Sequence, residues 1–197
     1  MLKNISIRLA DRLIKCGAIN ADHKEICIYG FQLLISSLFS TSLVLSVGIG
    51  LGKFPETAAF LIVYILLRSY SGGYHANSYA VCTIVTLFVY FSVILLATFV
   101  NVNISAYLSL FLVGVVLLFL LAPINSHKEI FSTDARRYKI ISLILFSVFV
   151  GLGMVWRAKN ISIGNAVFYS LCADLINLFP DCIECKKINK KRRTENV

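Results

Sequence analysis

Between two apolar segments the chain reads Arg68-Ser-Tyr-Ser-Gly-Gly-Tyr-His-Ala-Asn-Ser-Tyr-Ala-Val-Cys82. This stretch holds an acid–base residue (His75), a nucleophile (Cys82) and a cation (Arg68), and nucleophilic thiol catalysis needs a thiol together with a base. Gly72-Gly73 permits a backbone bend that side chains would forbid. We therefore expect the rest of the chain to be a scaffold for this stretch, and the flanking apolar segments indicate a membrane scaffold.

The composition also favours a membrane protein. Hydrophobic residues make up 58% of the 197 residues and charged residues 15%, with a mean hydropathy of +0.80. A soluble domain carries more charge, and long apolar runs are typical of membrane proteins.

The first 24 residues hold five cations and no apolar run long enough for a signal peptide, so we expect no cleavable leader. The net charge of +9 is explained more simply by cations retained on the cytoplasmic side than by nucleic acid, and we expect no nucleic-acid partner.

We predict an all-α, polytopic fold with about six transmembrane helices in a single domain, residues 1–197. Apolar runs predict spans at about 28–50, 56–70, 79–100, 104–122, 140–156 and 161–179. The second span is short and is expected to be tilted or to end below the interface. Residues 124–139 are expected to form a polar loop. Pro180 is expected to end the last span, which leaves residues 180–197 as a basic cytoplasmic tail.

An amphipathic cytoplasmic helix is predicted ahead of the spans, at residues 2–19. Its apolar face repeats at spacings of three and four: Leu2, Ile5, Leu9, Leu13 and Cys16. A basic helix of this kind either lies in the lipid headgroup region or packs against the protein's own loops, and the sequence leaves both open. Gly17 and Asn20 are expected to end it.

The distribution of charge predicts the topology. With the N-terminus in the cytoplasm, 16 of the 19 Lys and Arg residues lie on the cytoplasmic side, and only Lys53, Arg157 and Lys159 lie outside. The opposite orientation would violate the positive-inside rule. We therefore expect both termini, the 68–78 loop and the 124–139 loop in the cytoplasm of a multi-pass cell-membrane protein. In that compartment the cysteines are expected to be reduced.

The spacing within the motif constrains its chemistry. His75 and Cys82 are seven residues apart, which on one straight helix is about 10.5 Å along the axis and too far for proton transfer. If Asn77 or Ser78 caps the third span, His75 lies in the loop before it and Cys82 in the first turns of the helix. A helix N-terminus and a neighbouring imidazole both favour the thiolate.

The pattern Arg-x-x-x-Gly-Gly-x-His-Ala-x-x-x-x-x-Cys, after a short apolar span, resembles the AgrB (accessory gene regulator protein B) family. Its members are membrane peptidases of quorum-sensing systems in low-GC Gram-positive bacteria, and they cut the C-terminal tail from a small AgrD-type precursor peptide. The resemblance implies that Cys82 is the nucleophile that forms an acyl-enzyme thioester and that His75 is the base. Arg68 and Gly73 match further motif positions. A cysteine or serine of the bound peptide would then close a thiolactone or lactone ring.

Further cations near the motif suggest how a substrate is attracted. Arg136, Arg137 and Lys139 add to Arg68 and the C-terminal basic run on the predicted cytoplasmic face. This favours a precursor with an acidic tail, drawn in by long-range attraction. The alternative, that these cations only fix the topology, stays open.

The remaining candidates are weaker. Asp174, within the sixth span, either faces the bundle interior or belongs to a weak span whose cytoplasmic half lies at the interface, and we favour the second interpretation. Cys182 and Cys185 have zinc-like spacing, but a structural site needs two more ligands, so we expect no metal and no cofactor. A non-enzymatic peptide exporter or scaffold would explain the spans but not the clustering of His75 and Cys82. The sequence leaves the oligomeric state open, with a homodimer among the options.

Overall fold

The computed structural model is a bundle of helices, and it describes residues 2–17, 20, 23–71, 79–121 and 132–195. Within these ranges the chain forms seven helices and no strand. Their bounds are α1 (Leu2–Lys15), α2 (Lys24–Gly50), α3 (Phe54–Ser71), α4 (Tyr79–Phe99), α5 (Ile104–Leu121), α6 (Ser132–Lys159) and α7 (Ile161–Glu195). The predicted all-α class is confirmed.

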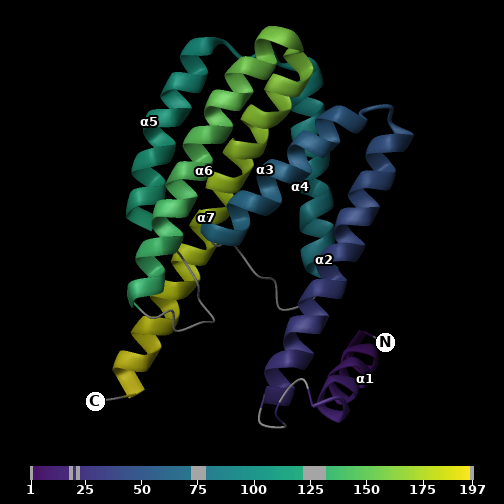
Figure 1. Ribbon diagram of the computed structural model, residues 1–197. Coiled ribbons are helices and arrows are strands. Elements are labelled where there is room, and N and C mark those ends of the chain that lie inside the picture. Colours follow the sequence, from purple (N-terminus) through teal and green to yellow (C-terminus); the bar gives the residue numbers. More distant parts are fainter. Residues whose placement is uncertain (1, 18–19, 21–22, 72–78, 122–131, 196–197) are drawn as a thin grey trace.

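Five segments of the described chain are long and apolar enough to cross a membrane: Lys24–Gly50, Ala80–Phe99, Ile104–Leu121, Arg136–Lys159 and Ile161–Phe179. Their outward faces carry many large exposed hydrophobic side chains, as expected where lipid replaces water. Helix α3 is not among the five, so the predicted count of six is not confirmed. Glu56 and Arg68, in its first and last turns, interrupt its apolar run. Figure 1 shows α3 running obliquely across the bundle.

Helix α7 lies at the centre of the bundle. It packs against α3, α4, α5 and α6, and half of its candidate span is buried, the largest share of the five. Leu171, Leu175 and Leu178 of α7 join the main apolar core with side chains of α3, α5 and α6. A second core joins α2, α3 and α4 around Phe60 and Tyr90. Tyr90 donates to or accepts from Thr57 at 2.9 Å, which satisfies its buried hydroxyl.

The N-terminal helix forms where the sequence predicts it but is shorter than residues 2–19. It ends at Lys15, and Gly17 follows with a φ of +68°, a conformation that only glycine adopts readily. Helix α1 packs against α2, and Asp11 pairs with Lys24 at 2.7 Å. Its placement in the lipid headgroup region stays a prediction.

Two predicted boundaries are wrong. Helix α6 begins at Ser132, so the second half of the expected 124–139 loop is helical. Helix α7 continues through Pro180 to Glu195. A proline removes one backbone hydrogen bond but does not prevent later turns from forming, and the lysines and arginines after it are good helix formers. Between α6 and α7 only Asn160 remains, and its Oδ1 accepts from the backbone N–H of Ser162 at 3.0 Å as an N-cap.

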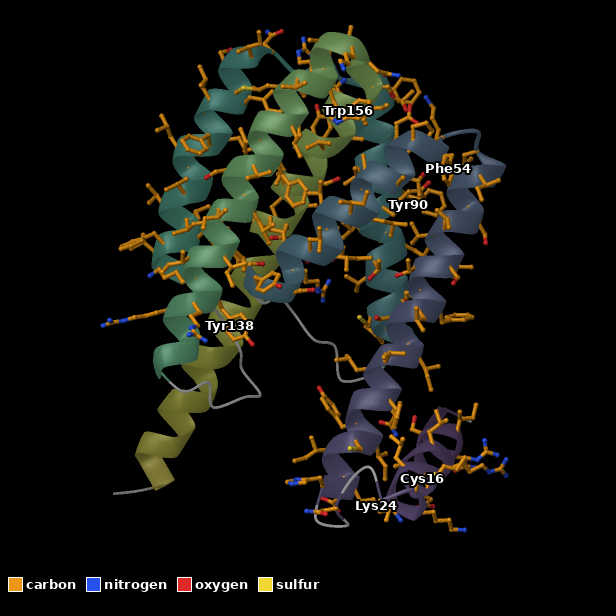
Figure 2. All side chains as sticks on the ribbon, in the orientation of Figure 1. Cys16, Lys24, Phe54, Tyr90, Tyr138 and Trp156 are labelled. Atoms are coloured by element: carbon orange, nitrogen blue, oxygen red, sulfur yellow. The ribbon has the colours of Figure 1, made fainter. Side chains whose placement is uncertain are left out.

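The ends of the helices sort to two sides of the bundle. Helix α1, the starts of α2, α4 and α6 and the C-terminal end of α7 point to one side (Figure 1). Lys24 and Cys16 lie at that end, and Phe54 and Trp156 lie at the opposite end (Figure 2). The predicted topology, with six crossings, stays a prediction. Which end faces the cytoplasm stays a prediction.

Candidate functional site

Cys82 lies in the first turn of α4, as predicted, and its side chain is a partly exposed free thiol. The next residue, Thr83, shares a 2.7 Å hydrogen bond with Ser40 of α2, which fixes the start of α4 against its neighbour. At a helix start, backbone N–H groups without intrahelical partners favour negative charge. The position therefore suits a nucleophilic thiol that a substrate can reach.

Arg68 lies in the last turn of α3 and contacts Tyr64 one turn earlier on the same helix. Its guanidinium donates to the Tyr64 hydroxyl, and its Cζ lies 5.4 Å from the centroid of the Tyr64 ring. Asn177 of α7 donates to the same hydroxyl from Nδ2 at 3.3 Å. Tyr64 is 3% exposed, so this hydroxyl joins Arg68 to α7 inside the bundle.

Asp174 is 1% exposed and faces the bundle interior, as the first of its two interpretations expects. Whether this half of α7 lies at the membrane interface stays a prediction. The hydroxyl of Ser71, the last residue of α3, donates to Asp174 Oδ2 at 3.2 Å. The positive charge of Arg68 also acts on the carboxyl group. A carboxyl group inside a membrane protein is costly unless it has such partners.

These residues form one group, which we call the α3–α7 polar cluster: Tyr64, Arg68, Ser71, Asp174 and Asn177. Tyr64 lies within electrostatic range of Cys82 as well as of Arg68 and Asp174. Three helices thus bring a thiol, a cation and a carboxyl group into one region. Of the predicted site residues, Arg68 belongs to this cluster and Cys82 lies within electrostatic range of its Tyr64.

Two predicted site residues, His75 and Gly73, lie outside the described residues. The same holds for the proposed caps Asn77 and Ser78 and for the Gly72-Gly73 bend. The pairing of His75 with Cys82 therefore stays a prediction.

The cations expected in the 124–139 loop lie instead on the first turns of α6, where Arg136 and Arg137 are exposed. Lys139 Nζ lies over the Phe119 ring, 4.0 Å from its centroid. Tyr138, between these cations, contacts Tyr70 of α3 with ring centroids 6.1 Å apart; Figure 2 shows Tyr138 where α6 passes this end of α3. The start of α6 therefore lies beside the turn of α3 that carries Arg68.

The cysteine pair with zinc-like spacing, Cys182 and Cys185, has side chains outside the described part of the structure. Among the side chains that are described, no group of three or more His, Cys, Asp and Glu could hold a metal ion. The described free thiols are those of Cys16, Cys27, Cys82 and Cys172.

The α3–α7 polar cluster has a signal in the sequence that extends beyond the Arg68–Cys82 motif, to Tyr64, Asp174 and Asn177. Asp174 and Asn177 are three residues apart, and Tyr64, Arg68 and Ser71 are spaced by four and three. On helices, both spacings place polar groups on one face. Polar stripes on two apolar helices indicate that the helices pair through them.

Comparison with known proteins extends over most of the chain. The family model described as accessory gene regulator B matches residues 6–178. The chain is 25% identical over 188 residues to accessory gene regulator protein B of Staphylococcus epidermidis, covering 94% of this chain and 84% of that protein. It is 27% identical over 160 residues to putative AgrB-like protein 2 of Clostridium perfringens, covering 74% and 75%. No solved structure matches the chain.

Proposed function

Because the chain belongs to the accessory gene regulator B family, we propose that it is a membrane cysteine endopeptidase that removes the C-terminal tail of an AgrD-type precursor peptide. Family membership supports a role in the peptide processing of accessory gene regulator quorum sensing. The observation that carries the finer proposal is the position of Cys82, which is partly exposed at the start of α4 and within electrostatic range of Tyr64 in the α3–α7 polar cluster. In contrast to the hydroxyl of Ser71, many other described Ser and Thr hydroxyls of the bundle donate to a backbone carbonyl of their own helix.

In the proposed reaction the Cys82 thiol loses its proton to His75, and the thiolate attacks the carbonyl carbon at the cleavage site. A sulfur–carbon bond forms, the peptide carbon–nitrogen bond breaks, and the departing amine takes the proton from His75. The tail leaves with a free amino group, and the N-terminal part of the precursor stays on Cys82 as a thioester.

The thioester is then resolved by the peptide itself. A cysteine or serine side chain of the bound peptide attacks the thioester carbonyl, which closes a thiolactone or lactone ring and returns the Cys82 thiol. Because a thioester stores the energy of the cleaved bond, ring closure needs no further cofactor. The product is an intermediate of an autoinducing peptide.

The proposal includes a location. The protein is placed in the cell membrane of a low-GC Gram-positive bacterium, with both termini and the Cys82 end of the bundle in the cytoplasm. The helix ends on the side of α1 carry most of the cations, as the positive-inside rule requires for cytoplasmic segments.

Co-expression with the AgrD-type precursor from the same genome, followed by mass spectrometry, tests the proposal. Cys82→Ala should abolish cleavage while precursor binding persists, and Cys82→Ser should be nearly inactive because an alkoxide is much harder to form than a thiolate. His75→Ala should be comparably inactive. The wild-type protein should carry a precursor adduct that neutral hydroxylamine releases, as a thioester requires.

The control variant replaces the five other cysteines together: Cys16, Cys27, Cys172, Cys182 and Cys185. This variant should keep most of its activity. Cleavage by Cys82→Ala, or equal loss in the five-cysteine variant, would instead favour a non-enzymatic exporter or scaffold.

A further inference from the structure

Asp174 and Asn165 are the two buried polar residues of α7 with bonds to other helices, and their partners differ in kind. Asn165, 0% exposed, bonds the backbone of the α4–α5 turn: its Nδ2 donates to the carbonyl of Val100 at 3.2 Å, and its Oδ1 accepts from the N–H of Val102 at 3.4 Å. These bonds satisfy chain groups that would otherwise be unpaired. Asn165 therefore has a structural explanation.

Asp174 has no comparable structural explanation. The bond it accepts comes from a side chain, the hydroxyl of Ser71, and not from an unpaired backbone group. Two apolar side chains at these positions would pack at least as favourably as a buried carboxyl–hydroxyl pair. A polar pair so buried, with Ser71 inside the Arg68–Cys82 motif, points to a task beyond holding α3 to α7.

The contacts indicate what the task is. Ser71 is the last residue of α3 and Arg68 lies one turn before it, and the carboxyl group of Asp174 acts on both. Asn177, one turn further along α7, reaches the same end of α3 through Tyr64. Two residues of the central helix thus fix the last turn of α3, which carries Arg68 and Ser71 of the Arg68–Cys82 motif.

We propose that Asp174 is a positioning residue of the Cys82 site, which acts through Ser71 and Arg68 to hold the end of α3 in the orientation needed for attack by Cys82. This inference rests on the proposed peptidase function. It adds a fixed acidic group to a site in which the sequence motif supplies no acidic member. A shift of about 1 Å in a catalytic group can lower a rate by about 100-fold, so an anchor of this kind affects the chemical step strongly.

Steady-state cleavage of the synthetic AgrD-type precursor from the same genome, by purified full-length protein in lipid nanodiscs, tests the proposal. Asp174→Ala removes both the acceptor for Ser71 and the carboxyl group that interacts with Arg68, and kcat should fall by about 100-fold with KM changed less than about twofold. Asp174→Asn keeps an acceptor oxygen but loses the ionisable carboxyl group, and it should lose about tenfold in kcat. Ser71→Ala should add nothing to the loss caused by Asp174→Ala, because both remove the same bond.

The matched control is Ser170, a buried serine one turn earlier on α7 whose hydroxyl bonds the carbonyl of Ala166 at 2.6 Å. Ser170→Ala should keep kcat within about twofold, because it loses a bond within its own helix. Thermal unfolding of each variant distinguishes an unfolded protein from a folded protein in which the end of α3 is displaced. Asp174→Asn is isosteric and should unfold at a temperature close to that of the wild type.

The outcomes separate this inference from the proposed function. If Asp174→Asn and Asp174→Ala cleave like Ser170→Ala while Cys82→Ala is inactive, the positioning role is overturned and the peptidase proposal stands. If Asp174→Asn lowers both kcat and the unfolding temperature, the loss of activity is explained by a less stable fold. This outcome also overturns the positioning role, in favour of a structural role. Cleavage by Cys82→Ala overturns the peptidase proposal itself.

Discussion

Arg136, Arg137 and Lys139 give the site a test at the scale of single residues. They lie on the first turns of α6, beside the end of α3. Replacing all three with Gln should raise the KM for the precursor several-fold with little change in kcat, because exposed cations attract an acidic tail over a distance but take no part in bond breaking. Kinetics at low and high salt check this, since screening over about 10 Å at 0.1 M should reduce the wild type's advantage.

Lys159→Gln provides the control for that triple variant. Lys159 is an exposed cation on the same helix at the opposite end of the bundle, and its loss should leave KM unchanged. If the triple variant keeps the wild-type KM at low salt, these cations only fix the topology.

Residue-level prediction reaches furthest where the chemistry is local in sequence. Cys82 and Arg68 belong to one continuous stretch, so their neighbourhood could be inferred without a fold. The role of Asp174 could not, because its partner Ser71 is 103 residues away and only the packing of α3 on α7 brings them together. An ionisable residue in a span indicates a function, but the sequence does not say which helix it faces.

At the scale of elements, Gly114 controls how closely α5 approaches α6. A Cβ at this position would lie 2.1 Å from Cζ of Phe146, so no larger side chain fits without moving that ring. Gly114→Leu should therefore lower the free energy of unfolding by roughly 1–3 kcal/mol, as overpacking does in other cores. Thermal unfolding in detergent measures the loss, and Phe146→Ala in the same chain should restore part of it.

Gly151 on α6 is the matched control for this substitution, because nothing lies within 4 Å of a Cβ built there. Gly151→Leu should unfold close to the wild type. If the two variants were equally stable, close packing of α5 on α6 at Gly114 would be refuted.

The helix boundaries show which physical signal the sequence carries. Hydropathy reports which residues face lipid, and the five candidate spans agree with predicted spans on that basis. It does not report where a helix ends in water, so the polar extensions of α6 to Ser132 and of α7 to Glu195 were missed. Helix α3 shows the opposite case. Glu56 and Arg68 lower its mean hydropathy, although α2, α4, α6 and α7 pack against it.

At the scale of the whole molecule, the span with the lowest hydropathy is the one at the centre. The Ile161–Phe179 segment has a mean hydropathy of 1.3 and is 50% buried, and the other four candidate spans are more apolar and at most 28% buried. A helix surrounded by protein can carry Asn165 and Asp174 because neighbouring helices satisfy them. The sequence predicted that this span was weak but not that it was central, since burial by other helices leaves no mark in a hydropathy profile.

Whether α3 counts as a crossing decides the topology of the whole chain. Without it, the five candidate spans would place the two termini on opposite sides of the membrane. With it, α3 returns the chain from the far end of α2 towards the start of α4 (Figure 1), and both termini lie on one side. The second arrangement keeps 16 of the 19 Lys and Arg residues on the cytoplasmic side.

Fusions of green fluorescent protein, which fluoresces only when inside, and of alkaline phosphatase, which is active only outside, distinguish these arrangements. We expect fusions after Asn20, within residues 124–139 and after Glu195 to fluoresce, because all three points lie on the cation-rich side. Fusions after Gly52 and after Asn160 should show phosphatase activity and serve as controls for the outer side. Phosphatase activity after Glu195 together with fluorescence after Asn20 would show an odd number of crossings, and the proposed access of a cytoplasmic precursor to Cys82 would then be untenable.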